Sequence, residues 1–340
     1  MRLLKILLLQ CILLCLCCAV VQAQPKKVII LETMTAPLVQ DMTDSFLDHL
    51  QSLGYQSNED YQIVRLNAEG NAENAETLLR KELEKGQPDL VVSVATYATK
   101  AAVKLLGNTN VPIVFIAVSD PIGSGIVKDV GKPTGTNITG IVFSVSEKTI
   151  IKMVLKTFSN CPKKRPLRFG VVYSGYHSAV GDARRLKEAA MDNPDIQFVF
   201  KKVAFRPGKE GEDPMLQAAA QAMRSLEGQV DFMWQPSDYM GALPQSSEVF
   251  AKASPVPIGF TRYIRSLEKG ALLRIVPSIV GSGVAAAQIV DSIWHGANPD
   301  SIPVKAPPTM DIGLNLSTMK NLNLVIPIEI MEFAKDNYVK

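Results

Sequence analysis

The segment DLVVSVATYATKAAVKLLGNTNVPIVFIAVSDP, residues 89–121, contains two runs rich in β-branched residues with a stretch of different composition between them. The runs at 89–95 and 113–118 are short, apolar and bounded by polar residues or Pro, which is typical of fully buried strands. The spacing over 98–106 predicts a helix. A strand, a helix and a second strand in this order indicate two parallel strands joined by a crossover helix.

The same alternation extends in both directions from this segment, so we expect an α/β protein with a doubly wound parallel sheet. The alternation occurs in two successive units of the chain. The polar stretch at 128–140 separates these units and is the expected crossover between two lobes. The tail contains one long helix at 281–295 and a Pro-rich end. The other predicted strands are 28–32, 61–66, 168–174, 198–205, 230–235 and 256–260.

Residues 1–23 have the composition of a secretory signal peptide, with Arg2 and Lys5 before an apolar run and cleavage expected after Ala23. We therefore expect an exported, periplasmic protein. Removal of this segment would leave Cys161 as the last of the five cysteines, too few for an internal disulfide. The 36 basic and 33 acidic residues nearly balance, which argues against a nucleic-acid partner. We expect a monomer.

Polar side chains follow most of the predicted strands, at the edge of the sheet where α/β proteins bind ligands. Hydroxyl groups and helix N-termini suit a carboxylate, an aspartate suits an ammonium group, and tyrosines suit a flat apolar group. The first unit contributes the candidates Thr35, Thr96, Tyr97, Ser119 and Asp120. The second unit contributes Ser174, Tyr176, Ser178, Asp238 and Tyr239.

Several of these candidates have an ordinary structural explanation as well. Asp120 precedes Pro121, a common turn and cap arrangement, and Asp238 can cap the helix that follows it. Tyr97 and Tyr239 can pack at the rim of a lobe without touching a ligand. Thr35 is the expected N-cap of the helix beginning near residue 37.

Catalytic motifs are weak in this sequence. Gly123-Ser-Gly125 lacks the third glycine of a dinucleotide-binding loop and follows the wrong strand for one. The histidines are isolated, which argues against a metal site. We expect no cofactor and no enzymatic activity; an exported enzyme using Asp120 or His177 is the alternative.

The segments PDLVVSVAT, VPIVFIAVSDPIGSGIV, TNITGI, GVVYS, PSDY and GSGVAAAQIVDSIWHGANP together resemble the tryptophan/tyrosine-type substrate-binding proteins of ABC transporters. The likeness extends from about Val28 to the segment LNLSTMKNLNLVIP. It implies the type I periplasmic binding-protein fold: two Rossmann-like lobes joined by a hinge of three strands. The implied lobes are 24–142 with about 272–300 returning to it, and 143–271 with about 301–340 returning to it.

The resemblance also implies a function. Such a protein captures a small polar ligand between its lobes and delivers it to a membrane permease driven by an ATPase; reporting the ligand to a membrane receptor kinase is the alternative. An amino acid, in particular an aromatic one, is the favoured ligand, with a peptide, a nucleoside or another metabolite left open. The chain departs from the family at Ala95-Thr96-Tyr97, where Gly-Thr-Pro is common, and the larger tyrosine leaves the size of the ligand open.

Overall fold

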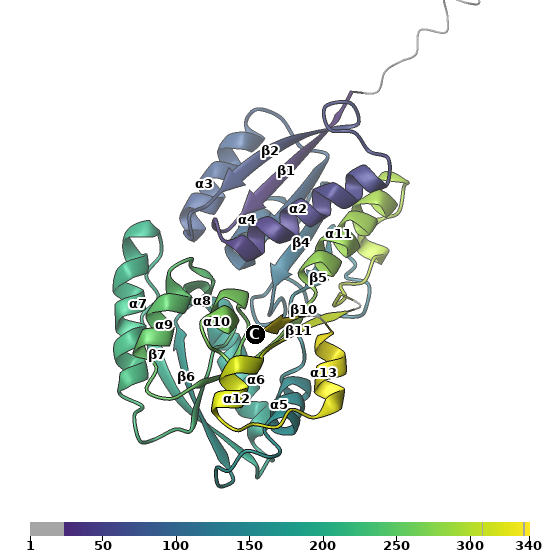
Figure 1. Cartoon of the computed structure of the whole chain (residues 1–340). Helices are drawn as coiled ribbons and strands as arrows, with labels where there is room; N and C mark the ends of the chain where they lie inside the picture. Colours follow the sequence, from purple (N-terminus) through teal and green to yellow (C-terminus); the bar gives the residue numbers. More distant parts are fainter. Residues whose placement is uncertain (1–23, 308, 336) are drawn as a thin grey trace, which may run out of the picture.

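The computed structural model describes residues 24–307, 309–335 and 337–340; the predicted signal peptide lies outside the described residues. The chain forms two lobes, each with its own β-sheet and covering helices (Figure 1). Within the described part of the chain, no helix is long and apolar enough to span a membrane.

The first lobe contains a five-stranded, all-parallel sheet in the order β2-β1-β3-β4-β5. From β1 the chain adds β2 on one side and the later strands on the other, so the carboxyl ends of β1 and β3 flank the topological switch point where such folds bind ligands. The strands are β1 (Lys26–Glu32), β2 (Tyr61–Asn67), β3 (Leu90–Val94), β4 (Ile113–Val118) and β5 (Ile138–Val142).

Successive residues of β1 face opposite sides of this sheet, as the two-residue period of a strand requires. Val28 and Ile30 belong to the core beneath α2 and α11, whereas Ile29 and Leu31 belong to the core beneath α3 and α4. The two helices α2 and α11 lie side by side (Figure 1) and approach closely at Gly283, where a β-carbon would lie 2.7 Å from backbone atoms of α2. The helices are α2 (Pro37–Ser52), α3 (Ala72–Leu83), α4 (Thr96–Leu106) and α11 (Ile279–Trp294).

The second lobe contains a seven-stranded sheet in the order β12-β11-β10-β9-β8-β6-β7, in which β11 is antiparallel to β10. Its strands are β6 (Leu167–Ser174), β7 (Ile196–Val203), β8 (Phe232–Trp234), β9 (Ile258–Thr261), β10 (Leu273–Pro277), β11 (Met310–Asn315) and β12 (Tyr338–Val339). The helices are α5 (Glu147–Thr157), α6 (His177–Ala190), α7 (Lys209–Arg224), α8 (Tyr239–Ala242), α9 (Ser246–Ala253), α10 (Ile264–Glu268), α12 (Leu316–Asn321) and α13 (Ile328–Ala334), with a 3-10 turn at Pro299–Ser301.

The chain passes between the lobes three times: after β5, between β10 and α11, and before β11. Backbone hydrogen bonds hold the three segments together: Val142 of the first donates to Lys305 of the third, and Ser278 of the second donates to Thr309 of the third, both at 2.9 Å. The two lobes and the three-segment connection are those of the type I fold that the resemblance implied. Within the tail, α11 packs on the first lobe while β10 pairs with β9 of the second.

The expected crossover at 128–140 is wrong at its end. Residues 138–142 form β5, which pairs with β4 and is buried, so the chain leaves the first lobe only after Val142. Gly140 makes this pairing possible, because a β-carbon there would collide with Phe115. The tail also contributes β10, β11 and β12, which the strand prediction lacks, because short strands that complete the edge of an existing sheet carry little periodicity of their own.

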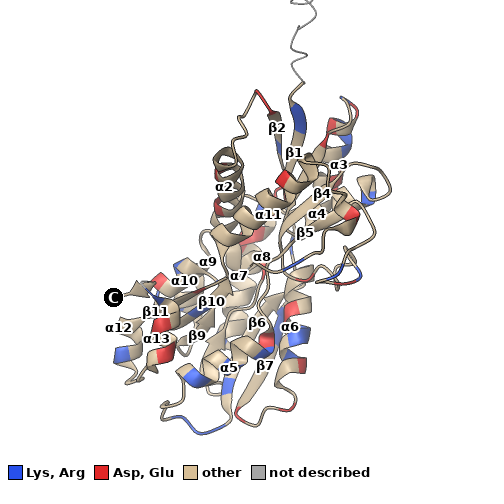
Figure 2. Cartoon of the chain, turned by 90° about the vertical axis from the view of Figure 1, so that its right-hand side faces the viewer, with Lys and Arg blue, Asp and Glu red and all other residues tan. Residues whose placement is uncertain are grey.

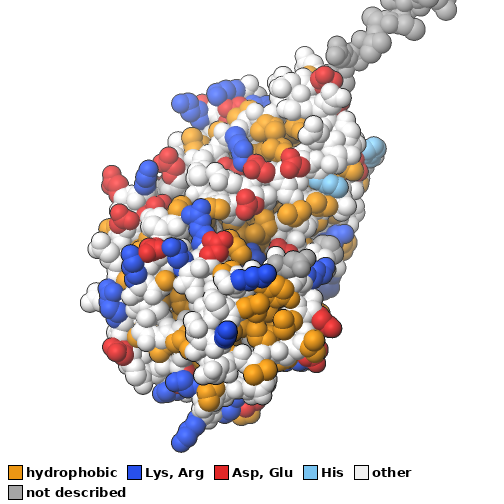
Figure 3. All heavy atoms as spheres, viewed as in Figure 1, with side chains coloured by type: hydrophobic (Ala, Val, Ile, Leu, Met, Phe, Trp, Pro, Cys, Tyr) orange, Lys and Arg blue, Asp and Glu red, His pale blue; other side chains and the backbone are white. Residues whose placement is uncertain are grey.

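Basic and acidic positions are interspersed along the backbone of both lobes in Figure 2. Figure 3 shows hydrophobic side chains gathered on the second lobe in the area of α12 and α13. Val325, Ile328 and Phe333 are exposed in this part of the chain.

Candidate ligand-binding site

A cavity of about 50 Å³ lies between the lobes, where the carboxyl ends of β3 and β4 face α6 and α8. We call it the interlobe cavity. Six of the ten predicted site residues line it: Thr96, Ser119, Tyr176, Ser178, Asp238 and Tyr239. Side chains that the sequence analysis did not select also line it, among them Met34, Ala95, Ala117, Phe143, Arg262 and Tyr263.

The other four candidates lie outside the lining of this cavity. Thr35 is exposed and accepts a hydrogen bond from Asn67. The N-cap of α2 is Ala36, so the prediction that Thr35 caps this helix is wrong; the helix begins with Pro37, whose missing N–H needs no cap. The remaining three candidates lie behind the cavity or at its edge, where they connect the elements that form its walls: Ser174, Tyr97 and Asp120.

Asp238 is fully buried and has three hydrogen-bond donors around its carboxylate. Its oxygens accept from the backbone N–H and the hydroxyl of Ser174, both at 2.6 Å, and from the N–H of Met240 at 3.3 Å. Asp238 therefore caps α8, as its ordinary explanation predicted, and joins it to the end of β6. Burial raises the pKa of Asp238 to about 6, against these hydrogen bonds, which favour the ionised form.

Asp120 forms the main ion pair between the lobes. Its carboxylate accepts from the N–H of Gly123 within its own turn and lies 2.8 Å from a guanidinium nitrogen of Arg185 on α6. Arg185 also contacts Glu147 and Asp182 of the second lobe. The turn explanation for Asp120 is thus correct, and the same side chain connects the first lobe to a buried charge network of the second.

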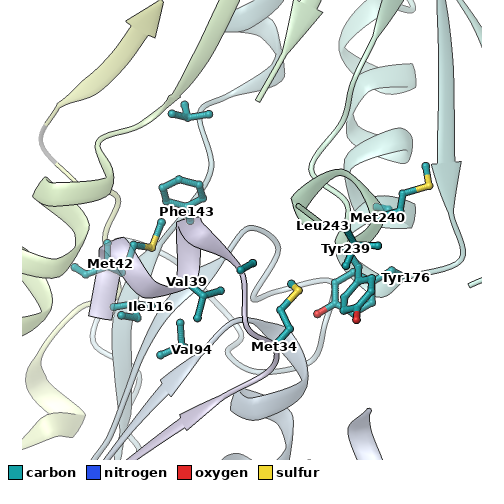
Figure 4. Close-up of a cluster of buried hydrophobic side chains, with 14 of the residues drawn as sticks. Met34, Val39, Met42, Val94, Ile116, Phe143, Tyr176, Tyr239, Met240 and Leu243 are labelled. Atoms are coloured by element: carbon teal, nitrogen blue, oxygen red, sulfur yellow. The ribbon is translucent and has the colours of Figure 1, made fainter. Parts of the chain in front are cut away.

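Tyr97 contacts the second lobe through its ring. It packs edge-on against Tyr176 at a centroid distance of 4.8 Å and lies 6.0 Å from Phe205. Tyr239 completes this interlobe aromatic cluster, at 5.8 Å from Tyr176 and 5.4 Å from Phe205. Figure 4 shows Tyr176 and Tyr239 adjacent to each other and near Met34 of the first lobe. Each such pair adds about 1 kcal/mol to the burial of the rings, so the cluster favours contact between the lobes.

Two hydroxyl groups in the interlobe cavity are buried without a hydrogen-bond partner among the described residues. They belong to Ser119, which follows β4 in the first lobe, and Tyr176, which precedes α6 in the second. The Nε atom of Arg262 is buried and unpartnered beside them, although its guanidinium also contacts Asp182 at 3.0 Å. Buried polar groups are rarely left unpaired, so these three point to a bound polar molecule.

The backbone around the cavity is strained at two positions. Ala95 has a φ of 68° and Ala117 a φ of 60°, in the left-handed region that favours glycine. Ala95 starts α4 and Ala117 lies in a bulge between β4 and β5, immediately before Val118 and Ser119. Strain of this kind concentrates at ligand-binding sites, because the surrounding fold holds it in place. No signal in the residue types alone could have identified these alanines.

Among the described residues, no group of three or more His, Cys, Asp or Glu side chains is placed to hold a metal ion. His177, the alternative acid or base, is the first residue of α6 and is exposed. Partial burial of its ring and the charge of Lys100 lower the pKa of His177. The site offers hydroxyl groups, one buried carboxylate and aromatic rings, which suit the binding of a small polar molecule.

The two-lobed fold is that of type I periplasmic binding proteins, and comparison with solved structures agrees. The chain is similar to a conserved domain protein from Vibrio cholerae (TM-score 0.77, 24% identity, covering 93% of this chain and 99% of that one). It is also similar to an ABC domain from Streptococcus pneumonia in complex with L-Trp (TM-score 0.73, 22% identity, 92% and 100%).

Residues 27–337 match the family described as ABC transporter substrate binding protein, and the chain belongs to this family. A curated relative, the tyrosine-binding protein of Clostridioides difficile strain R20291, is 25% identical over 303 residues, which cover 88% of this chain and 81% of the relative. The family resemblance in the sequence is thereby confirmed.

Proposed function

We propose that this chain is the extracytoplasmic solute-binding component of an ABC importer and that it captures an amine-bearing ligand of the amino-acid class in the interlobe cavity. The observation that carries the proposal is the pair of buried, unpartnered hydroxyls of Ser119 and Tyr176, one from each lobe. A ligand that forms hydrogen bonds with both hydroxyls links the two lobes and therefore favours the closed arrangement.

The small size of the cavity bears on how the ligand enters. A cavity needs a volume of about 10 to 15 Å³ to hold one water molecule, so about 50 Å³ has room for only a few waters and not for an amino acid. Entry therefore requires the lobes to separate about the three-segment connection and to close again with the ligand between them. The contacts of Asp120 with Arg185 and of Tyr97 with Tyr176 are the ones that open and re-form.

Asp238 is the proposed partner of the ligand's ammonium group, because it is a buried carboxylate in the lining. The aromatic rings beside it suit an apolar side chain. The tyrosine-binding relative and the L-Trp complex of a similar structure make L-tyrosine and L-tryptophan the first ligands to test.

The test has two stages. Mass spectrometry of what co-purifies with the protein, followed by calorimetric titration with amino acids, identifies the ligand; failure of every amine-bearing ligand to bind contradicts the proposed site. The importer role is then tested in proteoliposomes with any permease and ATPase that are found encoded beside the gene. Ligand-bound protein is expected to stimulate ATP hydrolysis, and a response only from a receptor kinase would favour the sensory alternative.

A further inference from the structure

A second small cavity adjoins the interlobe cavity and contains a buried cation. Four residues line both cavities and form the wall between them: Leu38, Ala242, Arg262 and Tyr263. The second cavity also has a volume of about 50 Å³ and opens, past Ile264 and Ile279, into a groove of about 690 Å³ between α2 and α11 and the second lobe. Arg274 of β10 lines both the second cavity and the groove.

The guanidinium of Arg274 has no partner among the residues that the structure describes. Arg274 is 5% exposed, its Nε atom is buried without a hydrogen bond, and its side chain makes neither an ion pair nor a hydrogen bond with a described residue. By contrast, Arg262, the other buried arginine beside this cavity, contacts Asp182 at 3.0 Å. An arginine keeps its charge in a protein, so an unpaired buried guanidinium is costly and points to an anionic partner.

We propose that Arg274 forms an anion-binding subsite that takes a distal carboxylate of the ligand, beyond the wall formed by Leu38 and Tyr263. This deepens the proposed function and rests on it for the position of the ligand's amine at Asp238. The substrate class is then an amino acid or short peptide with a carboxylate remote from its amine. Leu38 belongs to the first lobe, so separation of the lobes removes one side of the wall, and a ligand that reaches Arg274 keeps Leu38 apart from Tyr263 when the lobes close around it.

The acidic residues around Arg274 select the charge of this group. Asp41, Asp44 and Asp48 of α2 and Asp311 of β11 line the same groove. The carboxylate of Asp311 accepts from the N–H of Ile279 at 3.2 Å and makes no ion pair with Arg274, although its charge partly opposes the burial that lowers the pKa of Arg274. These charges repel a doubly charged phosphate more strongly than a singly charged carboxylate. A guanidinium binds a carboxylate through two parallel hydrogen bonds, so the single charge of a carboxylate is sufficient for binding at Arg274.

The experiment compares matched ligands on the wild-type protein and on Arg274→Met, with Arg274→Lys as the charge-retaining control. L-glutamate and L-glutamine differ mainly in the distal group, and L-2-aminoadipate keeps the distal carboxylate of L-glutamate on a chain that is one methylene longer. We expect the wild type to bind L-glutamate more tightly than L-glutamine by about tenfold or more. Arg274→Met should lose this preference. L-tyrosine binding is expected to be the same in both proteins. Equal preference in wild type and Arg274→Met overturns the subsite and leaves the proposed function intact.

Two further measurements of the melting temperature do not require the amine of a ligand to bind at Asp238. Acetate, titrated against chloride at constant ionic strength, should raise the melting temperature of the wild type and not that of Arg274→Met; an equal response of both proteins overturns the subsite even if no amino acid binds. Phosphate should act more weakly than acetate. The ligand-free Arg274→Met protein should melt at a higher temperature than the wild type, because an unpaired buried charge has been removed. A lower melting temperature would show that Arg274 is structural and would overturn the proposal.

Discussion

Asp238 has a structural role as the cap of α8 and a proposed role in ligand binding, because it also lines the interlobe cavity. Its carboxylate caps α8 and binds Ser174, and its pKa of about 6 places its ionisation in an accessible range. Because burial raises the pKa above its usual 3.8, the stabilising contribution of this group to the ligand-free fold is complete below pH 3.8 and is lost as the pH rises through about 6. Binding of an ammonium group has the opposite dependence, because it requires the ionised carboxylate.

The affinity for an amine-bearing ligand should therefore fall as the pH is lowered through about 6. Asp238→Asn should bind such a ligand more weakly at pH 8, by roughly 1 to 3 kcal/mol, and with little change between pH 5 and 8. Calorimetric titration over this range measures both. Asp231→Asn is the control, because Asp231 pairs with Arg168 outside the cavity lining; identical pH profiles for wild type and Asp238→Asn would remove Asp238 from the site.

Tyr176 and Tyr263 form a matched pair of buried tyrosines with different environments. The hydroxyl of Tyr176 is unpartnered, whereas that of Tyr263 accepts from the N–H of Asp238 at 2.8 Å and contacts the carbonyl of Pro236 at 3.0 Å. Tyr176→Phe should leave the melting temperature of the ligand-free protein unchanged and weaken ligand binding by about 1 kcal/mol. Tyr263→Phe should lower the stability by roughly 1 to 3 kcal/mol, since it leaves buried groups unpaired. Denaturant unfolding and titration together test this; destabilisation by Tyr176→Phe would reveal a partner for its hydroxyl.

At the scale of elements, α6 of the second lobe is in contact with the turn after β4 of the first. Gly181 of α6 permits this approach, because a β-carbon there would collide with the carboxylate of Asp120. The ion pair of Asp120 with Arg185 lies at the same contact. The effect of Asp120 on ligand binding is thus expected to act through closure, since Asp120 does not line the interlobe cavity.

Gly181→Ala should oppose closure while favouring the helix itself. Alanine stabilises a helix interior by about 1 kcal/mol relative to glycine, so the variant should fold normally. The added methyl group pushes the Asp120 turn away, and we expect a more open average structure in small-angle X-ray scattering together with weaker ligand binding. Lys187→Ala, an exposed change on the same helix, is the control. Unchanged scattering and affinity in Gly181→Ala would show that this contact does not control closure.

At the scale of the whole molecule, the core of the first lobe continues across the junction into Tyr176, Tyr239 and Met240 of the second. The closed arrangement therefore has apolar, aromatic and ionic contacts of its own, to which the proposed ligand would add polar contacts in the interlobe cavity. A ligand shifts the balance between open and closed states only by its preference for one of them.

Ligand binding should raise the melting temperature and reduce the radius of gyration together. At a concentration one hundred times the dissociation constant, the gain in free energy of unfolding is about 2.7 kcal/mol. Differential scanning fluorimetry and small-angle scattering measure the two effects on the same samples. A rise in melting temperature without compaction would place the ligand outside the contact between the lobes.

The order of strands and helices could be read from the sequence because it depends on local patterns. The runs at 113–118 and 168–174 are apolar and β-branched, and the segment 37–53 has helical spacing, so each specifies its own element. The strands β5, β10, β11 and β12 escaped prediction, because they are short and carry little periodicity of their own. The resemblance to the family came from several short segments together, which no periodicity would have shown.

The sequence by itself determined most of the strands and helices, the parallel strand pairs and the polar side chains at the ends of the strands, because each follows from residues close together in the chain. Only the tertiary structure decided which of those side chains share a cavity. Three features depend on how the two lobes meet: the ion pair of Asp120 with Arg185, the ring contact of Tyr97 with Tyr176, and the position of the unpaired Arg274 between the lobes. The charge and burial that define the site arise from this packing, since a side chain's partners are set by distances between segments that are remote in sequence.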